Sequence, residues 1–233
     1  MSDSRLGWHL SGTGFTDLLA PEDLRAFMQV CPERPYERGS YLFHAGDPAT
    51  HLHVLARGQV KLVAPTPDGR ERILAVCGPS DFCGEAFIEG EGVYRVDAVA
   101  LTDAATCPMS QEDYRRLALH APGFVLTFTQ ILAGKLFGCR DQLTRVESPI
   151  RARVAELLLA QARRYGREDD DDGWWHLDTE LRHDDIAGMI PATRVSVTSA
   201  MANLRAAGVL EGTRGKYRLH LEGLAAAAEG DDR

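Results

Sequence analysis

The residue types best suited to binding chemistry lie between Leu181 and Leu204, where two short helices are predicted around a tight turn. Pro191 is predicted to end the first helix, because proline lacks a backbone donor and disfavours helical geometry in the residue before it. Thr193 is the predicted cap of the second helix. Apolar residues at helical spacing predict a buried stripe on that helix: Val197, Ala200, Met201 and Leu204. The pattern indicates a helix-turn-helix with a defined inner face.

The opposite face of the second helix carries an arginine, a valine and several hydroxyl side chains in its first two turns. Those turns enter the major groove in DNA-binding helix-turn-helix proteins. An arginine bonds both acceptors of a guanine edge, a valine packs on a thymine methyl group, and hydroxyls reach bases or phosphates. The alternative is a helical hairpin of a bundle, whose exposed side favours Glu, Lys and Ala. The predicted DNA-binding residues here are Thr193, Arg194, Val195, Ser196, Thr198 and Ser199.

A β-hairpin wing is predicted between Val209 and His220, where two short β-prone runs flank a glycine-containing turn. Arg214 and Lys216, with Arg218, are expected near DNA phosphates. A solvated basic hairpin is the alternative for each of them. Six basic and three acidic residues lie between Leu181 and His220, so the positive charge is local.

Composition sets limits on the whole chain. Its 233 residues, 44% hydrophobic and 26% charged, suit a globular protein of two domains. A net charge of −8 argues against a protein that coats nucleic acid non-specifically, although a dimer with a small basic face can still bind DNA specifically. Neither a signal peptide nor a membrane-spanning run is found, so a cytoplasmic protein without a membrane partner is expected.

The five cysteines are odd in number and show no paired metal-binding motif, which predicts reduced, buried thiols and no metal centre. His51 and His53 resemble the start of the histidine pair of cupin metal enzymes, but the following positions offer no acidic third ligand. These histidines are therefore predicted on the outer face of a strand. A cupin-like metal enzyme stays the remote alternative. No nucleophile-base set is found, so no catalytic residue is predicted and the chain is not expected to be an enzyme.

From Tyr36 to Met109 the chain alternates short β-prone runs with glycines, which suggests a small antiparallel barrel or jelly roll. Two of the runs, Val60–Val63 and Arg72–Leu74, are expected to pair across the turn signal Pro67–Asp68–Gly69. The predicted strands are Tyr41–Phe43, His51–Leu55, Val60–Val63, Arg72–Val76 and Arg95–Leu101.

Helices are predicted to frame this region, one of them starting at a Ser110–Asp113 capping box and a longer one running from Phe124 to about Glu147. Alternating spacings of four and three give the longer helix a heptad seam, at Leu132, Leu136, Cys139, Leu143 and Val146. The seam can pack on its own domain or pair two subunits, and dimerisation is the favoured interpretation. Ser148 and Pro149 are expected to open the next helix, as cap and first residue. The expected domains are 15–122, a β-roll; 123–147, a dimerisation helix; and 148–222, a winged helix-turn-helix, an α+β fold overall.

This order of parts resembles the Crp/Fnr family of bacterial transcription regulators over nearly the whole chain, from about Phe15 to His220. The resemblance is carried by the glycine series of the roll, by Phe82–Glu85 with Arg95, and by the helix-turn-helix. It implies a cyclic-nucleotide-binding-like roll and a homodimer that binds a pseudo-palindrome with half-sites about one helical turn apart. It also implies an activator that recruits RNA polymerase.

The resemblance further implies a ligand site in the roll. In cyclic-AMP-binding relatives, the pair matching Gly84 and Glu85 and an arginine ten residues beyond the glutamate hold the ligand, which makes Arg95 the matching arginine. Backbone donors after Gly84, from Ala86 among others, and the Arg95 guanidinium suit a cyclic phosphate, while the Glu85 carboxylate can accept a ribose hydroxyl.

Two positions depart from the cyclic-AMP pattern. Val96 stands where binders have Ser or Thr, and Cys139, next to Gly138, stands where hydroxyl side chains meet the purine. A roll that acts without ligand, with Glu85 and Arg95 paired as structure, is the alternative. A third departure lies in the recognition helix, which resembles the nitrogen-control branch that senses 2-oxoglutarate. With Val195 in place of a glutamate, readout of a cytosine amino group is expected to be lost, so Arg194 is the main predicted reader.

Overall fold

The structure is a computed structural model that describes residues 15–65, 71–90, 92–144, 148–169, 173–179, 181–190, 192–213 and 215–229. The chain divides into two compact units that meet in sequence between Ala133 and Gly134. Each unit is described by itself below.

The first unit is built on two four-stranded antiparallel sheets. One sheet has the strand order β1-β8-β3-β6 and the other β2-β7-β4-β5, so sequence neighbours are often in different sheets. These two sheets form the predicted β-roll, in a chain of the predicted α+β class. The strands are β1 Arg34–Tyr36, β2 Tyr41–Phe43, β3 His51–Arg57, β4 Val60–Pro65, β5 Glu71–Cys77, β6 Phe82–Cys83, β7 Asp97–Ala100 and β8 Ala104–Ser110.

All five predicted strands of the roll are present, and β4 pairs with β5 as expected, with Val63 opposite Ile73. The turn Pro67–Gly69 lies outside the described residues. Strand β8, the central partner of β1 and β3, was not predicted. Its first four residues are all buried, and a strand covered on both faces lacks the alternation by which strands are recognised.

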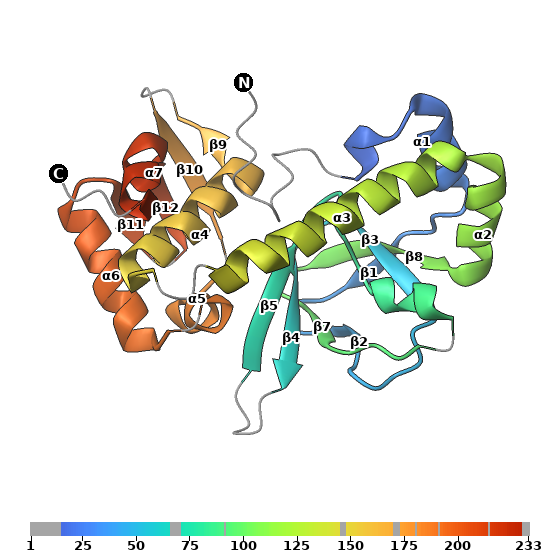
Figure 1. Ribbon diagram of the computed structural model, residues 1–233, viewed down its shortest axis with the longest axis horizontal. Helices are drawn as coiled ribbons and strands as arrows, with labels where there is room; N and C mark the ends of the chain where they lie inside the picture. The colour runs from blue at the N-terminus through green and yellow to red at the C-terminus, as the bar shows by residue number, and fades with distance from the viewer. Residues whose placement is uncertain are drawn as a thin grey trace. The chain divides into compact units, whose positions relative to one another are not determined.

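The first unit also contains helical segments, the last of which continues past Ala133 into the second unit: η1 Thr16–Leu18, α1 Pro21–Gln29, η2 Glu85–Glu89, α2 Gln111–His120 and α3 Pro122–Thr144. Ser110 and Asp113 form the predicted capping box at the start of α2. Figure 1 shows α1 and α2 beside the first turns of α3. There Phe15 meets Phe124 edge to face at 5.1 Å, and Phe27 stacks on Phe124 at 5.8 Å. This aromatic cluster anchors the start of α3 in the core of the roll.

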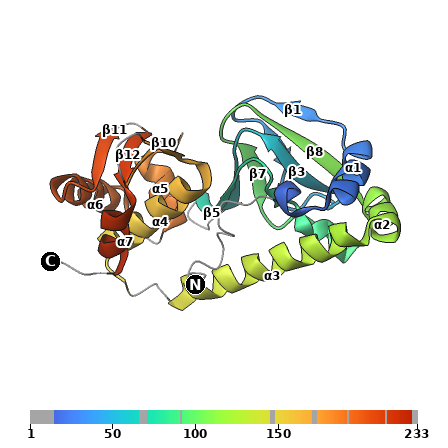
Figure 2. The ribbon, with the colours of Figure 1, turned by 90° about the horizontal axis from the view of Figure 1, so that it is seen from above.

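The second unit contains a four-stranded sheet with the order β11-β12-β10-β9, together with four helices after α3. Helices α4 and α7 pack against each other and against β12 (Figure 2). The elements are α4 Ile150–Tyr165, β9 Arg167–Glu168, β10 Trp174–Asp178, α5 His183–Met189, α6 Arg194–Ala206, β11 Leu210–Thr213, β12 Lys216–His220 and α7 Leu221–Glu229. Helices α5 and α6 with the hairpin β11–β12 are the predicted helix-turn-helix and wing.

One predicted helix start in this unit is wrong by a residue. Pro149, not Ser148, is the N-cap of α4, and no side chain caps this helix. Proline suits this position, because a backbone N–H at the start of a helix has no acceptor within the helix, so no hydrogen bond is lost when proline lacks it.

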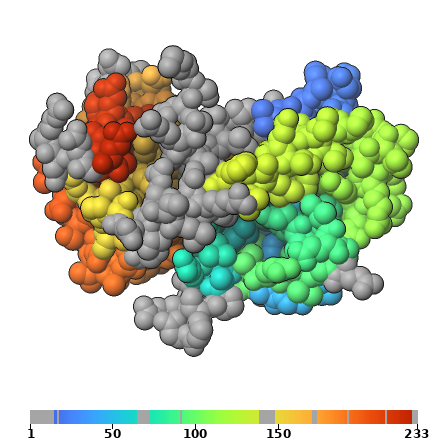
Figure 3. All heavy atoms as spheres, in the orientation of Figure 1, coloured from blue at the N-terminus to red at the C-terminus, as the bar shows by residue number. Residues whose placement is uncertain are grey.

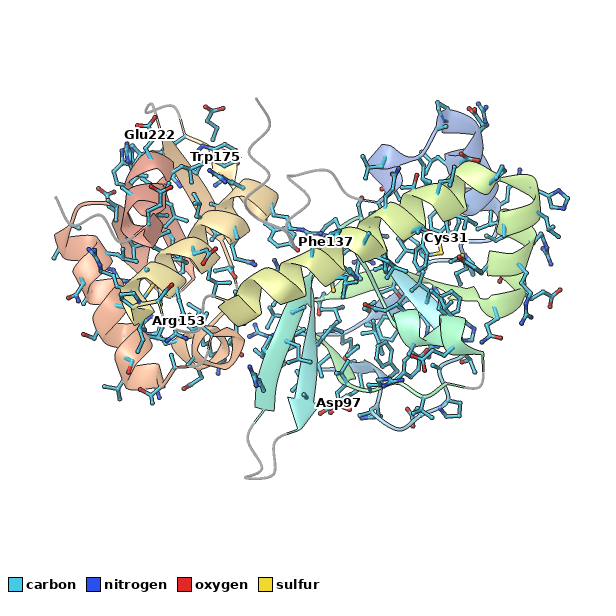
Figure 4. All side chains as sticks on the ribbon, viewed as in Figure 1. Cys31, Asp97, Phe137, Arg153, Trp175 and Glu222 are labelled. Atoms are coloured by element: carbon cyan, nitrogen blue, oxygen red, sulfur yellow. A yellow bond between two sulfur atoms is a disulfide. The ribbon has the colours of Figure 1, made fainter. Side chains whose placement is uncertain are left out.

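The cysteines differ from the expectation of reduced thiols, because Cys31 and Cys107 form a disulfide across 76 residues of sequence (Figure 4). The pairing of β1 with β8 brings them together, with Arg34 opposite Thr106. No local sequence signal reports such a contact. Cys77 and Cys83 are buried, as predicted.

Within the described residues, no single helix is long and apolar enough to cross a membrane. The helix pair Gln111–His120 and Pro122–Phe137, bent by 116°, passes the same length and composition test only as a pair.

Candidate functional site

Helix α6, the predicted recognition helix, has the inner face that its sequence predicts. Val197, Met201 and Leu204 are fully buried and Ala200 nearly so. Thr193 caps the helix, as expected, because its hydroxyl accepts a hydrogen bond from the Ser196 backbone N–H at 3.1 Å. The two hydroxyls of Thr193 and Ser196 also lie 2.9 Å apart. Both are thus engaged at the helix start, which holds the first turn of α6 in place.

The outer face of α6 is open to solvent. Arg194, Thr198 and Ser199 are exposed, and Val195 is an apolar side chain with 78% of its surface exposed. An exposed valine beside an arginine suits contact with a thymine methyl group next to a guanine. The Arg194 guanidinium lies 3.8 Å from the Asp184 carboxylate of α5, in a loose ion pair at the surface.

Two residues of α5 that the sequence analysis did not assign reach this face. Asp184 faces Arg194, and His183 Nδ1 lies 2.9 Å from the Thr198 hydroxyl. The Thr198 hydroxyl also donates to the Arg194 carbonyl at 2.9 Å. Burial, with the nearby Arg205 and Arg194 cations, lowers the pKa of His183. An imidazole and an acidic side chain at the start of α5 were the available signal for these contacts.

The wing is tied to α6 by Arg205, whose Nε–H donates to the Gly212 carbonyl at 3.1 Å. Lys216 is exposed at the start of β12, while Arg214 lies outside the described residues. Arg218, expected near phosphates, is instead held by Asp169 and Glu211 and lies over the Trp174 ring at 4.6 Å. The expectation for Arg218 is corrected, because its charge is already neutralised within the unit.

The predicted ligand residues of the roll gather around η2. Gly84 adopts φ +88°, and a Cβ atom there would lie 2.9 Å from the His51 carbonyl oxygen, so the position requires glycine. Glu85 and Ala86 follow as the first residues of η2. Val96 is half-buried and packs against the core. The side chain of Cys139 lies outside the described part of α3.

Arg95 has a carboxylate partner that the spacing did not predict. Its Nη2 lies 3.0 and 2.9 Å from the two carboxylate oxygens of Glu89, where Glu85 had been the expected partner in a ligand-free roll. Gly92 permits this approach, since a Cβ there would lie 3.0 Å from the Glu89 Cβ. Gln111 fixes the end of η2 by donating to the Phe87 and Gly90 carbonyls. The loop thus places the Glu89 carboxylate on Arg95, the residue that was expected to bind the ligand phosphate.

Helix α3 exposes apolar residues beside the predicted seam as well as within it. Leu132 packs partly against the core of the roll, whereas Leu126, Leu136 and Phe137 are 66%, 53% and 57% exposed. Ala133 is exposed as well. Figure 3 shows side chains of α3 at the surface, and Figure 4 labels Phe137 on this helix. The side chains of Cys139 and Leu143 lie outside the described part, as does Val146.

His53 is not on an outer strand face as predicted, because only 4% of it is exposed. Its Nδ1 lies 3.2 Å from the Thr106 hydroxyl, and burial lowers its pKa to about 4. Among the described residues, no group of three or more His, Cys, Asp or Glu side chains is placed to hold a metal ion.

Comparison with protein families matches both halves of the chain. Residues 33–120 match the cyclic nucleotide-binding domain, and residues 152–227 match the Crp-like helix-turn-helix domain. These matches cover the roll with the Gly84–Arg95 segment and the unit that carries α6.

Similar proteins span most of the chain. It is 27% identical over 195 residues to a CRP-like cAMP-activated global transcriptional regulator of Mycobacterium tuberculosis, covering 83% of this chain and 86% of that protein. It is 29% identical over 193 residues to the cyclic AMP receptor protein of Thermus thermophilus, covering 82% and 85%. A mutant of CooA from Carboxydothermus hydrogenoformans has the same fold, with a TM-score of 0.75 at 19% identity over 95% of this chain and 99% of that one.

Proposed function

Since the chain belongs to the Crp/Fnr family of bacterial transcription regulators, we propose that it regulates transcription as a homodimer that places two copies of α6 in successive major grooves of a pseudo-palindromic site. The observation that carries this proposal is the two-faced helix α6. Its inner face is buried, and its outer face presents Arg194 and Val195 to solvent. Base reading requires that combination of a rigid support and an open polar and methyl-bearing surface.

The proposed subunit contact runs along α3. Leu126, Ala133 and Phe137 follow one another at spacings of seven and four along the exposed side of this helix. Apolar side chains at heptad-like spacing on an exposed helix face favour pairing with a second helix, because pairing removes them from water. The proposed contact surface is therefore displaced by one residue from the predicted seam at two positions, with Ala133 in place of Leu132 and Phe137 in place of Leu136. Leu136 lies at the edge of this surface.

The proposed effector is an anionic ligand that binds at η2, with cyclic AMP as the first candidate. The ligand phosphate would take the place of the Glu89 carboxylate on Arg95, and Glu85 would accept a ribose hydroxyl. Val96 offers no hydroxyl to the phosphate, so the site has fewer donors than that of a cyclic-AMP binder with Ser or Thr there. Ligand-independent action is the second candidate, and the existing Arg95–Glu89 pair favours it. An effector such as 2-oxoglutarate is a third.

We further propose that the protein acts in the cytoplasm as an activator that contacts RNA polymerase, without enzymatic activity of its own. A bound effector can change DNA affinity only if it binds the DNA-competent state more tightly than the other state.

The test is selection of genomic DNA fragments by the purified chain, with and without cyclic AMP, at one fixed salt concentration. Enrichment of a palindrome only with the nucleotide would establish a cyclic-AMP-gated regulator. Equal enrichment without it would assign ligand-independent binding or a different effector. Failure to enrich any sequence, under conditions where the protein is folded and dimeric, would contradict the proposal.

A further inference from the structure

His183 connects the two helices of the helix-turn-helix at the face proposed to meet DNA. It is the first residue of α5, and its Nδ1 lies 2.9 Å from the Thr198 hydroxyl on the outer face of α6. The ring is half-buried, while Thr198 is exposed. An ionisable ring therefore touches a residue of the proposed reading face directly.

The hydrogen-bond pattern determines which ring nitrogen carries a proton. The Thr198 hydroxyl donates its single hydrogen to the Arg194 carbonyl, at 2.9 Å. Its oxygen can then only accept from His183, so Nδ1 is the protonated nitrogen. In a neutral ring with this pattern, Nε2 is a bare acceptor. Only the protonated ring donates from both nitrogens.

Burial is the largest cause that lowers the pKa of His183, and the Arg205 and Arg194 cations of α6 lower it further. Asp184 on its own helix acts in the opposite direction, and the balance favours the neutral ring in the free protein. A DNA phosphate would add a negative charge and an acceptor at this place. Both favour the protonated ring.

We propose that His183 is a proton-linked phosphate contact. When α6 enters the major groove, the imidazole takes up one proton from solvent at Nε2 and donates it in a hydrogen bond to a backbone phosphate oxygen. The Nδ1–H meanwhile keeps its bond to Thr198, and Thr198 keeps its bond to the Arg194 carbonyl. The inference rests on the proposed DNA-binding function and adds one proton per subunit to the binding equilibrium.

The direction of the pH effect follows from linkage. Each subunit of the complex binds one more proton than it does in the free protein, which makes two protons per dimer, so DNA affinity rises as pH falls. The slope is at most about tenfold per pH unit for each subunit, and therefore about hundredfold for the dimer, between the pKa of His183 in the free protein and its higher pKa in the complex. The same charge increases the number of neutralised phosphates by one per subunit at low pH, which steepens the salt dependence.

The experiment measures binding of the full chain to its selected palindrome and to a scrambled duplex by fluorescence anisotropy, from about pH 5.5 to about pH 8.5 at constant ionic strength. Four proteins are compared: the wild type, His183→Gln, His183→Arg and His176→Gln. His176 is a matched control, because it lies in the same unit on β10 and its Nε2 pairs with Asp169, 3.1 Å away.

We expect wild type and His176→Gln to bind the palindrome more tightly as pH falls, by severalfold to about tenfold over the range. His183→Gln should lose this slope and bind at the weak, high-pH level. His183→Arg should also be flat, but at the tight, low-pH level, because its charge is permanent. A purely structural role for His183 would not be rescued by arginine.

The outcomes separate the two proposals. A wild type that does not distinguish palindrome from scrambled duplex contradicts the proposed function, and this inference with it. A wild type that does distinguish them, while His183→Gln keeps the full pH slope, overturns only the role of His183. If circular dichroism shows that His183→Gln is unfolded, the comparison of wild type with His183→Arg decides the question. A pH dependence of DNA affinity that is no steeper in wild type than in His183→Arg would then overturn the role of His183.

Discussion

The roll and the DNA-reading unit each contain a histidine bonded to a threonine hydroxyl, and burial gives the two histidines different roles. His53 Nδ1 lies 3.2 Å from the fully buried Thr106 hydroxyl, inside the core of the roll. His183 Nδ1 lies 2.9 Å from Thr198 at the surface. A buried neutral ring can only serve the fold, whereas an accessible one can gain a proton when an anion arrives.

Each unit also pairs an arginine with a carboxylate, and here the contact geometry differs. One nitrogen of Arg95 lies 2.9 and 3.0 Å from both oxygens of Glu89, whereas Arg194 makes a single contact of 3.8 Å with Asp184. The anionic ligand proposed for Arg95 would have to replace a well-placed carboxylate. Arg194 is only loosely oriented by its partner, which suits its proposed contact with a base.

The largest expected effect concerns the buried histidine. The unfolded chain takes up a proton at His53 with a pKa near 6.5, but the folded roll does so only near pH 4. Stability is therefore fully present above about pH 6.5 and declines by about 3 kcal/mol as pH falls to about 4. Urea unfolding across this range should show the decline in wild type and a smaller one in His53→Gln. His120→Gln, an exposed histidine of α2, should behave as wild type; equal declines in all three would refute the assignment.

Replacing Arg194, the proposed base-reading residue, should have the next largest effect. Arg194→Ala should weaken palindrome binding by about 1–3 kcal/mol and relax the preference at one base pair per half-site, because the bidentate contact to guanine is lost. Competition binding with a library of single-base variants measures both effects. Arg163→Ala, an exposed arginine of α4, serves as the control. An unchanged base preference in Arg194→Ala would remove this residue from the reading face.

Replacing Glu89, whose carboxylate pairs with Arg95, should have the smallest effect. An exposed ion pair contributes about 0.2–1 kcal/mol, so Glu89→Gln should raise affinity for a fluorescent cyclic-AMP analogue by up to about fivefold. Arg95→Ala should weaken that binding strongly, and Glu112→Gln, an exposed acid paired with Arg116 on α2, should leave it unchanged. Equal binding by the wild type and Glu89→Gln would show that Glu89 does not compete with the ligand. Absence of binding by all four proteins would favour ligand-independent action.

Local signals were sufficient for the helix-turn-helix and most of the roll. The stripe at Val197, Met201 and Leu204, the Thr193 cap and the wing follow from helical periodicity, capping chemistry and a glycine turn, all of which act over a few residues. Five strands of the roll were predicted for the same reason. The buried strand β8 was not, since its residues do not alternate between an apolar and a polar face.

The sequence by itself therefore determined most of the elements, their order and the residue types on the outer face of α6. Only the tertiary structure decided the partners: Glu89 on Arg95, His183 on Thr198, the burial of His53, and the Cys31–Cys107 disulfide. These pairs join residues brought together by loop geometry, helix packing or strand pairing. Which side chain meets which across such contacts depends on the register and approach of whole elements, and no pattern of neighbouring residues encodes these.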